Sequence, residues 1–390
     1  MDKSKWEYKK LGEVCKVING LWTGKKPPFV NVGVIRNANF TKTCELDASN
    51  IAYIDVEKKQ FDQRKLIKGD IIIEKSGGSD KQPVGRPVLF NLDGDFSFSN
   101  FTSALRIEDH HDIYSNYLYK YLKYVYFSGA TKAMQSNTTG LHNLDFSKFK
   151  ALLIPIAPLS DQQRIVAELD CLNEMIAVKQ EQLMEFDKLA QSIFYDMFGN
   201  GYEKKLLGDF CEVGTGSTPS RKNEGLFYGG QIPWVKTTEV QNSDIYKTEE
   251  TITDTAIEQT NCKLYPIGTI LMAMYGQGKT RGQVARLMIK AATNQACAAI
   301  IPDDKVCDRD YLYEYLLLSY EKIRDMARGG NQANLNLQLV RSIPVPLPPL
   351  SLQQQFADKI QAIEAQKELV KKSIVETQHL LDSRMDYYFD

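Results

Sequence analysis

The sequence predicts an α+β protein: two mixed α/β domains, each followed by a long helix, with the two helices pairing as an antiparallel coiled coil. Three observations predict this class. The chain repeats itself in order, each copy ends in a long segment without Gly or Pro, and short apolar runs within each copy are separated by Gly, Pro, Asn and Asp. The 390 residues also exceed the length of one ordinary domain.

The repeat is clearest at the two ends of each copy. Residues 6–20, WEYKKLGEVCKVING, reappear at 202–216 as YEKKLLGDFCEVGTG. Residues 154–163, IPIAPLSDQQ, reappear at 345–354 as VPLPPLSLQQ. Looser matches between these ends keep the same order, so we interpret the chain as a tandem duplication. The expected boundaries are a domain at 1–158, a helix at 159–200, a second domain at 201–349 and a second helix at 350–390.

The interior of each copy has the same kinds of segment. Apolar runs that predict strands include DIIIE, PVLF and SALRI in the first copy, and GTILMAM and ACAAII in the second. A helical stretch follows in each, from Tyr114 and from Arg309. Each copy is therefore expected to form a mixed α and β domain with much loop.

The long helices are predicted by heptad seams. The first helix follows Pro158, with Ser160 as the expected N-cap and Gln163 three residues on. Lys179 and Lys367 interrupt the two apolar seams, as polar residues do where they select register. We expect the helices to pair antiparallel, which relates the domains by an approximate twofold. Packing of each stripe on a globular domain, or a homodimer, would give the same pattern. The seams are Ile165, Leu169, Leu172, Ile176, Lys179, Leu183, Phe186, Ala190, Ile193 and Met197, and Phe356, Ile360, Ile363, Lys367, Val370, Ile374, Thr377, Leu381 and Arg384.

Composition excludes several classes of protein. No run of eighteen apolar residues predicts a membrane span, and the charged N-terminus has no apolar stretch behind it, so we expect a cytoplasmic protein. The seven cysteines form no C-x-x-C pair, and only four histidines are present, which favours reduced thiols and no metal site. Residues 201–350 hold 17 Lys and Arg against 17 Asp and Glu, so the chain is not a uniformly basic nucleic-acid protein, although local basic loops remain compatible.

Residues 272–283, MAMYGQGKTRGQ, contain a Gly-Lys-Thr triplet like that of a phosphate-binding loop. The match fails at the first glycine position, which is Ala273, and Gly282 falls within the first turn of the helix that must follow. The first copy has no such triplet. A nucleotide-dependent enzyme that uses residues 276–280 therefore stays as the alternative function.

The two copies share a different feature, an apolar strand that runs into a Gly-rich loop with Lys, Arg, Gln and Ser or Thr. Lys and Arg neutralise phosphates, and Arg and Gln can form paired hydrogen bonds with guanine or adenine edges. A second polar loop recurs later in each copy. Taken singly, the Gly-rich loops would more often be ordinary solvated loops, and the polar residues of the second loops could equally form turns and caps. Recurrence at matching positions favours the DNA-binding interpretation. The predicted DNA-binding residues are Lys75, Ser76, Lys81, Gln82, Arg86, Asn137, Thr138, Gln277, Lys279, Thr280, Arg281, Gln283, Arg286, Asn331, Gln332 and Asn334.

The whole pattern resembles the specificity (S) subunit of type I restriction–modification systems. The resemblance rests on an L-G-[ED] start to each half, G-S-T-P-S at 216–220 followed by IPWVKTTEV, NQACAAIIP at 294–302, and P-L-S-x-Q-Q opening each long helix. It implies that each globular half is a target recognition domain for half of a bipartite double-stranded DNA site. It also implies that the helices fix the spacing and bind methyltransferase (M) subunits, two in number, through which restriction (R) subunits join. Ala157 stands where the second copy has Pro348, and the first half has LWTGKKPPF in place of G-x-T-P.

The absence of catalytic motifs agrees with this resemblance. We find no [ND]-P-P-[YFW] tetrapeptide of a DNA adenine methyltransferase, no recognisable nuclease carboxylate cluster and no helicase set. The expected protein is a non-catalytic reader without cofactors, and S-adenosylmethionine, ATP and Mg²⁺ would bind to partner subunits. A purely structural coiled-coil scaffold is a third hypothesis, which predicts no affinity for DNA.

Overall fold

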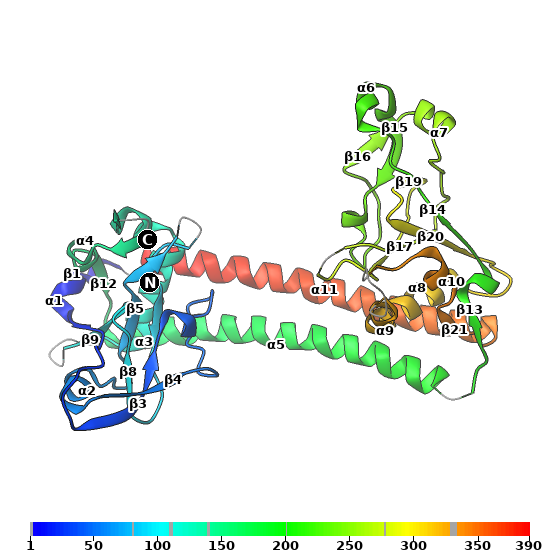
Figure 1. Ribbon diagram of the computed structural model, residues 1–390. Helices are drawn as coiled ribbons and strands as arrows, with labels where there is room; N and C mark the ends of the chain where they lie inside the picture. Colours follow the sequence, from blue (N-terminus) through cyan, green and yellow to red (C-terminus); the bar gives the residue numbers. More distant parts are fainter. Residues whose placement is uncertain are drawn as a thin grey trace. The chain divides into compact units, whose positions relative to one another are not determined.

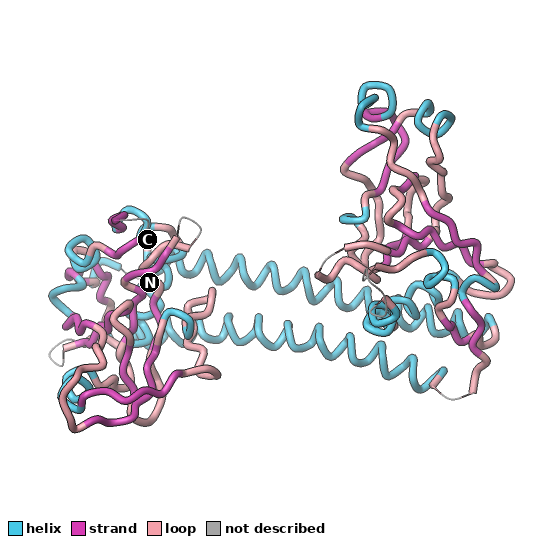
Figure 2. Tube along the Cα trace, viewed as in Figure 1, coloured by secondary structure: helices cyan, strands magenta, loops and turns pink. Residues whose placement is uncertain are grey.

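The computed structural model describes residues 3–79, 82–108, 112–138, 141–199, 201–276, 278–327 and 334–390. The chain divides into two compact units, Met1–Lys179 with Ser373–Asp390, and Gln180–Lys372 (Figure 1). Each unit contains one globular domain and a part of each long helix. Figure 2 shows short strands and loops gathered in each domain, beside long helical segments. The predicted α+β class is confirmed.

The first domain contains four small sheets. The strand orders are β2-β9-β5-β7, β4-β3-β8, β10-β11-β6 and β1-β12. Among the named strands of the described residues, β3 and β8 pair in parallel and the other pairs are antiparallel. The strands are β1 (Glu7–Lys10), β2 (Cys15–Asn19), β3 (Phe29–Ile35), β4 (Ala52–Glu57), β5 (Ile71–Glu74), β6 (Ser76–Gly78), β7 (Pro87–Leu89), β8 (Phe96–Phe98), β9 (Thr102–Ile107), β10 (Gln135–Thr138), β11 (Leu141–Leu144) and β12 (Leu153–Ile156). The helices are α1 (Leu11–Val14), α2 (Lys58–Arg64), α3 (Ser115–Phe127) and α4 (Phe146–Lys150).

The second domain repeats three of these sheets. Their orders are β14-β20-β17-β18, β16-β15-β19 and β13-β21, again with one parallel pair, β15 with β19. The strands are β13 (Lys204–Leu206), β14 (Cys211–Thr215), β15 (Tyr228–Val235), β16 (Glu250–Ile252), β17 (Ile270–Ala273), β18 (Val284–Arg286), β19 (Ala292–Thr293), β20 (Cys297–Pro302) and β21 (Pro344–Pro346). The helices are α6 (Glu224–Phe227), α7 (Asp254–Gln259), α8 (Arg309–Leu318), α9 (Tyr320–Met326) and α10 (Leu337–Arg341).

The duplication extends to the strand register. Ile71 pairs with Leu89 on one side of β5, as Ile270 pairs with Arg286 on β17. Both central strands are buried throughout, which explains their continuous apolar runs. A side chain on Gly216 would lie 1.6 Å from the carbonyl oxygen of Thr293, and a side chain on Gly20 would meet Ser99 in the same way. The glycine that ends the first repeated segment is thus required by a close backbone approach.

The long helices are α5 (Leu159–Phe198) and α11 (Leu350–Phe389). Each has 40 residues, which corresponds to about 60 Å at about 1.5 Å per residue. The first begins at Leu159, so Ser160 lies in its first turn rather than at the predicted N-cap, and the carbonyl oxygen of Pro158 accepts the first helical hydrogen bonds.

The two helices pair antiparallel within each unit. In the first unit, Glu168 of α5 contacts Arg384 at 2.9 Å and the hydroxyl of Tyr388 at 2.6 Å. Further along, Lys179 Nζ donates to Thr377 Oγ1 at 2.7 Å. In the second unit, Lys367 forms an ion pair with Asp187 at 2.8 Å. Partner numbers on α11 fall as those on α5 rise, which confirms the predicted antiparallel coiled coil.

Aromatic residues join the end of one helix to each domain. Phe389, the last residue of α11, packs edge-on against Tyr117 and Tyr121 of α3, at centroid distances of 5.5 and 5.6 Å. Phe198, the last residue of α5, packs against Tyr311 at 5.3 Å in the same manner. Each domain therefore shares its core with the end of one long helix as well as with the start of the other.

A buried glutamine fixes the start of each long helix to its domain. Gln162 Nε2 donates to the carbonyl oxygens of Ala157 and Asp112, and its Oε1 accepts from the Tyr114 amide. Gln353 makes the equivalent bonds to Pro348, Val306 and Asp308. Both side chains are fully buried. The repeated P-L-S-x-Q-Q motif is thus a clamp between a helix and a domain.

Candidate nucleic-acid interface

The Gly-rich loop predicted in each domain is called its reading loop below. In the first domain this loop follows the central strand β5 and forms hydrogen bonds with the hairpin β10–β11. The Lys75 carbonyl accepts from the Leu144 amide at 2.8 Å, and the hydroxyl of Ser76 bonds to the side chain of Asn143. Strand β6 pairs antiparallel with β11. The structure thus brings the first and second polar loops of this domain together at one edge. Partial burial lowers the pKa of Lys75, whose side chain remains partly accessible.

Several predicted residues of this domain can be placed only in part. Asn137 and Thr138 lie on β10 opposite His142 and Leu141, where only their backbone is described. Gln82 is partly exposed, and its amide donates to the carbonyl oxygen and the hydroxyl of Ser79. Lys81 lies outside the described residues.

Arg86 lies inside the first domain, in a network that occupies its side chain. Its Nε donates to Glu74 Oε2 at 2.6 Å, and Nη1 donates to the carbonyl oxygen of Phe40 at 3.1 Å. The side chains of Arg86 and Glu74 are 6% and 1% exposed. Because a buried ion pair is costly to break, these contacts give Arg86 a structural role. The sequence alone could not indicate this role, since the pairing depends on two strands meeting.

The second predicted reading loop connects two antiparallel strands, β17 and β18. The Gly282 amide donates to the carbonyl oxygen of Ala273, and the Ala273 amide donates to that of Gln283, each at 2.9 Å. A phosphate-binding loop must lead directly into a helix, whereas strand β18 follows here. The nucleotide-binding alternative therefore has no support from the loop geometry.

Helix α9 holds this loop from one side. The hydroxyl of Tyr320 donates to the carbonyl oxygen of Lys279 at 2.5 Å, and Arg324 Nη2 donates to that of Gly278 at 2.7 Å. Lys279 is exposed, and Thr280, Arg281 and Gln283 are partly exposed. A loop whose backbone is fixed while its polar side chains reach solvent can present them without a large entropy cost.

The remaining predicted residues of the second domain differ in their surroundings. The guanidinium of Arg286 pairs with Asp244 at 2.8 Å and Asp310 at 2.5 Å, and stacks 4.5 Å from the ring centroid of Tyr313. It therefore braces β18 against α8. Asn334 is exposed, and the next residue, Leu335, donates its amide to the carbonyl oxygen of Met274, so this segment lies beside the reading loop. Gln277, Asn331 and Gln332 lie outside the described residues.

The structure adds a third element to this edge, a turn that was not among the predicted site residues. Phe101, which is 50% exposed, accepts from the amides of Lys75 and Ser76 through its carbonyl oxygen. In the second domain the matching turn carries exposed Gln295, and Ala296 accepts from the Met274 amide at 2.8 Å. The sequence carried a signal for these turns, because they lie in two loosely matching segments, SNFTSALRI at 99–107 and TNQACAAII at 293–301.

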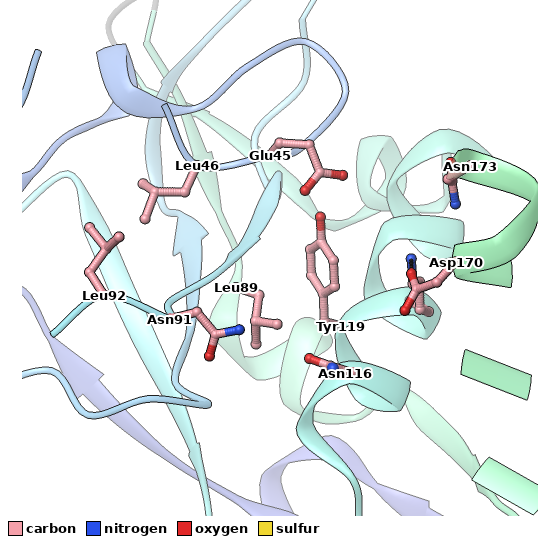
Figure 3. Close-up of a pocket in the computed structure, with 10 residues that line it drawn as sticks. Glu45, Leu46, Leu89, Asn91, Leu92, Asn116, Tyr119, Asp170 and Asn173 are labelled. Atoms are coloured by element: carbon pink, nitrogen blue, oxygen red, sulfur yellow. Dashed lines mark ion pairs between the residues drawn. The ribbon is translucent and has the colours of Figure 1, made fainter. Parts of the chain in front are cut away.

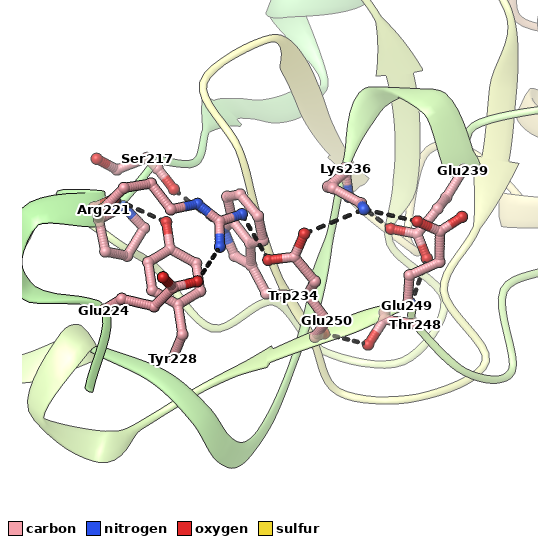
Figure 4. A network of polar contacts seen from close by, with 11 residues as sticks. Ser217, Arg221, Glu224, Tyr228, Trp234, Lys236, Glu239, Thr248, Glu249 and Glu250 are labelled. Carbon is pink, nitrogen blue, oxygen red and sulfur yellow. Dashed lines mark hydrogen bonds and ion pairs between the residues drawn. The ribbon is translucent and has the colours of Figure 1, made fainter. Parts of the chain in front are cut away.

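The G-S-T-P-S segment of the second domain packs on a network of charged side chains (Figure 4). Trp234 donates to the carbonyl oxygen of Ser217 at 3.1 Å, and Arg221 stacks 4.0 Å from the ring centroid of Tyr228. Glu250 accepts from Arg221 and from Lys236, and these bonds hold the pKa of its carboxyl below the ordinary value. The carboxylates of this network outnumber its two cations, Arg221 and Lys236, so the network does not suit DNA phosphates. These carboxylates are Glu224, Glu239, Glu249 and Glu250.

The first domain has a pocket of about 500 Å³ beside the start of α5 (Figure 3). Lys120 pairs there with Asp170, and the hydroxyl of buried Tyr119 donates to the carbonyl oxygen of Cys44. Burial and nearby Glu45 raise the pKa of Tyr119. Strand register places Leu89, which lines the pocket, at the position of Arg286 in the second domain. In the second domain the residue at this strand position, Arg286, contacts Asp310 and Tyr313 of α8.

The sequence matches the family described as type I restriction modification DNA specificity domain twice, over residues 3–185 and 199–378. The chain belongs to this family. Among curated relatives, the specificity subunit of the type I restriction enzyme MjaIX from Methanocaldococcus jannaschii is 30% identical over 188 residues, 45% of this chain and 42% of that protein. That match thus spans less than half of the relative's length. The putative MjaX specificity subunit of the same organism is 20% identical over 94% of this chain and 88% of its own length.

Solved structures share the fold over 98% of this chain. A chain from a structure of a type I restriction–modification system, described for its complex assembly and conformational transition, aligns with a TM-score of 0.67 at 18% identity and covers 98% of this chain and 97% of its own. The S subunit from M. genitalium aligns with a TM-score of 0.55 at 14% identity, over 98% and 95%. At these identities the likeness supports the fold and not the individual contacts.

Membrane and metal features are both missing from the part of the chain that the structure describes. No described helix combines the length and apolar character that crossing a membrane requires. The described residues also contain no group of three His, Cys, Asp or Glu side chains arranged to hold a metal ion. Six cysteines are buried and Cys171 is exposed, all of them free.

Proposed function

We propose that this protein is the sequence-specific DNA-recognition subunit of a type I restriction–modification complex, in which each globular domain reads one half of a bipartite target. The observation that carries the proposal is an arrangement of polar loops that recurs in both domains. In each domain a Gly-rich loop leaves the central buried strand and lies beside a second polar segment and an exposed turn. The subunit is non-catalytic, and its place is in the cytoplasm.

The DNA contacts belong to side chains that remain accessible at these edges. Lys279 and Arg281 suit phosphates or guanine, and Gln283 and Gln295 suit adenine, because a carboxamide can both donate and accept. Arg86 and Arg286 are excluded because their ion pairs within the protein are already formed. The first-half set is Lys75, Ser76, Gln82 and Phe101, with Lys81, Asn137 and Thr138 retained from the sequence. The second-half set is Lys279, Thr280, Arg281, Gln283, Gln295 and Asn334, with Gln277, Asn331 and Gln332 retained.

The paired helices set the spacing between the half-sites and bind two methyltransferase subunits, through which restriction subunits join. S-adenosylmethionine, ATP and Mg²⁺ would bind to those partners, which supply the chemistry. The support for this assignment is the antiparallel register, because fixed polar pairs such as Lys179 with Thr377 keep the helices from sliding.

Selection from random duplex DNA tests the reading function. The protein, assembled with its methyltransferase subunits, should recover two short conserved half-sites separated by a gap of fixed length. Recovery of one continuous site would contradict the two-domain reading, and recovery of no conserved sequence by the assembled complex would contradict DNA reading altogether. Calorimetry with ATP and Mg²⁺ tests the alternative of a nucleotide-dependent enzyme. Tight stoichiometric binding of ATP to the isolated chain would support that alternative, and our proposal predicts no such binding.

Insertion of one heptad into both helices tests the spacer function. The insertions belong after Lys179 and after Lys372, because both points lie between the Lys179–Thr377 pair and the Asp187–Lys367 pair. The paired insertion should lengthen the gap by about 10 Å, or roughly three base pairs. Insertion after Lys179 alone is the matched control, since it breaks the register without a compensating change. An unchanged gap in the doubly extended, folded protein would refute the spacer function.

A further inference from the structure

A cleft lies beside the reading loop of the first domain. It has a volume of about 560 Å³ and is lined by three groups of described residues: Lys42, the loop residues Ser79, Gln82, Pro83 and Arg86, and the end of α3 with the turn that follows it. It is lined by Lys42, Ser79, Gln82, Pro83, Arg86, Tyr126, Phe127, Gly129 and Lys132. Ser79 and Gln82 exchange backbone hydrogen bonds, so the cleft is continuous with the reading loop.

The described residues that line the cleft carry positive charge that is only partly compensated. Of the described residues that line it, three are cationic and none is acidic. Arg86 is neutralised by Glu74, which lies behind it. Lys42 and Lys132 are exposed, and neither has an ion pair among the described residues. Two free ammonium groups beside a hydroxyl and a carboxamide suit a phosphodiester, which offers charged oxygen acceptors only.

The second domain shows how the same space can be closed. Tyr117 and Tyr311 occupy matching positions, because each donates to the carbonyl oxygen of the equivalent proline, Pro155 or Pro346. This alignment matches Tyr126 with Tyr320 and Ala130 with Arg324. In the second domain Tyr320 and Arg324 bond directly to the reading loop. Ala130 has no side-chain donor, and α3 ends at Phe127, so in the first domain the space stays open.

We propose that this cleft binds a backbone phosphodiester of double-stranded DNA at the first half-site, held by Lys42 and Lys132. The proposal rests on the proposed function and extends it to a phosphate contact outside the reading loops. In the second domain the residues at the matching positions, Tyr320 and Arg324, bond to the reading loop instead. The cleft orients the duplex on the first domain without reading a base, since lysines that contact phosphate carry no sequence information.

The test is the double variant Lys42→Gln/Lys132→Gln in the complete complex. Its affinity is measured against salt concentration, for a selected target duplex and for a random duplex of equal length. Removal of one phosphate contact should reduce the slope of log affinity against log salt by about 0.9, and at 0.05 M salt should weaken binding about tenfold, on both duplexes alike. The control is Lys16→Gln/Lys59→Gln, which replaces two exposed lysines of the same domain that do not line the cleft.

Neutral methylphosphonate substitutions locate the contact on the DNA. When they are scanned along both half-sites, the wild-type complex should lose affinity at one or two phosphates of one half-site where the double variant loses none. A salt slope equal to that of the wild type, or of the control, would overturn the cleft as a phosphate site. Failure of the proposed function is distinguished by the wild-type complex, which would then show no preference for the selected duplex over the random one. In that case the cleft proposal, which rests on the proposed function, is refuted as well.

Discussion

Replacement of the buried glutamine at the start of α11 should uncouple that helix from its domain. Gln353→Ala removes two donated hydrogen bonds, to Pro348 at 2.8 Å and Val306 at 3.2 Å, and one accepted from the Asp308 amide at 2.8 Å. Asp308 is also the N-cap of α8, where its side chain accepts from the Tyr311 amide. One side chain thus joins α11, the loop after β20 and the start of α8.

The cost follows from the burial of these groups. Gln353 has no exposed surface, so its three backbone partners would lose a bond where water cannot simply replace it. A hydrogen bond contributes about 1 kcal/mol net, and a partner left unsatisfied costs about 1–3 kcal/mol. Partial relaxation will admit some water, so we expect a decrease of about 2–4 kcal/mol in the free energy of unfolding of the unit that contains Gln353. Gln162→Ala should have the same effect on the other unit.

Urea unfolding followed by circular dichroism measures this decrease, and hydrogen exchange locates it. Gln353→Ala should lower the unfolding midpoint of its unit and speed amide exchange at the starts of α8 and α11. Gln354→Ala is a closely matched control, since it removes the next, exposed glutamine of the same motif. If both variants lose equal stability, or if Gln353→Ala keeps the wild-type midpoint, the clamp interpretation is refuted.

Three other outcomes are expected. Burial and then Glu364 raise the pKa of Glu314 from 4.5 to about 7, so the folded state holds this proton more tightly than the unfolded state. Stability should therefore fall as pH rises from about 4.5 to about 7. Glu314→Gln should remove this pH dependence of the urea midpoint, and a pH dependence that persists in the variant would have to come from another group. A thiol reagent should modify Cys171 alone in the native protein and all seven thiols in denaturant, because the other six are buried. Burial raises the pKa of Cys15, Cys44 and Cys211 to about 12, which disfavours their reactive thiolate form. Rapid reaction of a second thiol in the native protein would show that one of the six is accessible. Arg286→Ala should lower the free energy of unfolding by about 1–3 kcal/mol. Arg281→Ala should leave stability unchanged and weaken binding to the second half-site by about 1–3 kcal/mol. Stability and DNA affinity are measured for both variants, and the reverse result would contradict the assignment of a structural role to Arg286 and a DNA contact to Arg281.

The parts of the fold that were predicted correctly are those with strong local patterns. The run IIIE at 71–74 became a fully buried central strand, and the segments without Gly or Pro became α5 and α11. The helical stretch from Arg309 was also predicted, although the chain breaks it into α8 and α9 at Ser319, which no Gly or Pro marks. Repetition strengthened each of these predictions, because two weak patterns at matching positions support each other.

The roles of single polar residues could not be predicted in the same way. Arg86 and Arg281 stand in similar Gly-rich contexts, yet one is buried against Glu74 and the other reaches solvent in part. The difference depends on whether a neighbouring strand supplies a carboxylate, which is a tertiary property. The loosely repeated sequence marks the turn at Phe101, but its place beside the Gly-rich loop depends on tertiary hydrogen bonds from the Lys75 and Ser76 amides to the Phe101 carbonyl oxygen. The contact residues therefore remain predictions.

The polar seam residues select one register from the alternatives that the heptad pattern allows. In the observed register Lys179 lies against Thr377 and the carbonyl oxygen of Ser373. A shift of one heptad in one direction would bring Lys179 opposite Arg384, and a shift in the other direction would bring it opposite Val370. The first shift places like charges together, and the second leaves the ammonium of Lys179 without its hydroxyl partner in a largely apolar seam, so both are costly. Apolar residues alone would allow all three registers at similar energy. The lysines therefore supply the positional definition that a fixed spacing between two half-sites requires, and Lys179→Leu should make that spacing less uniform without unfolding the helices.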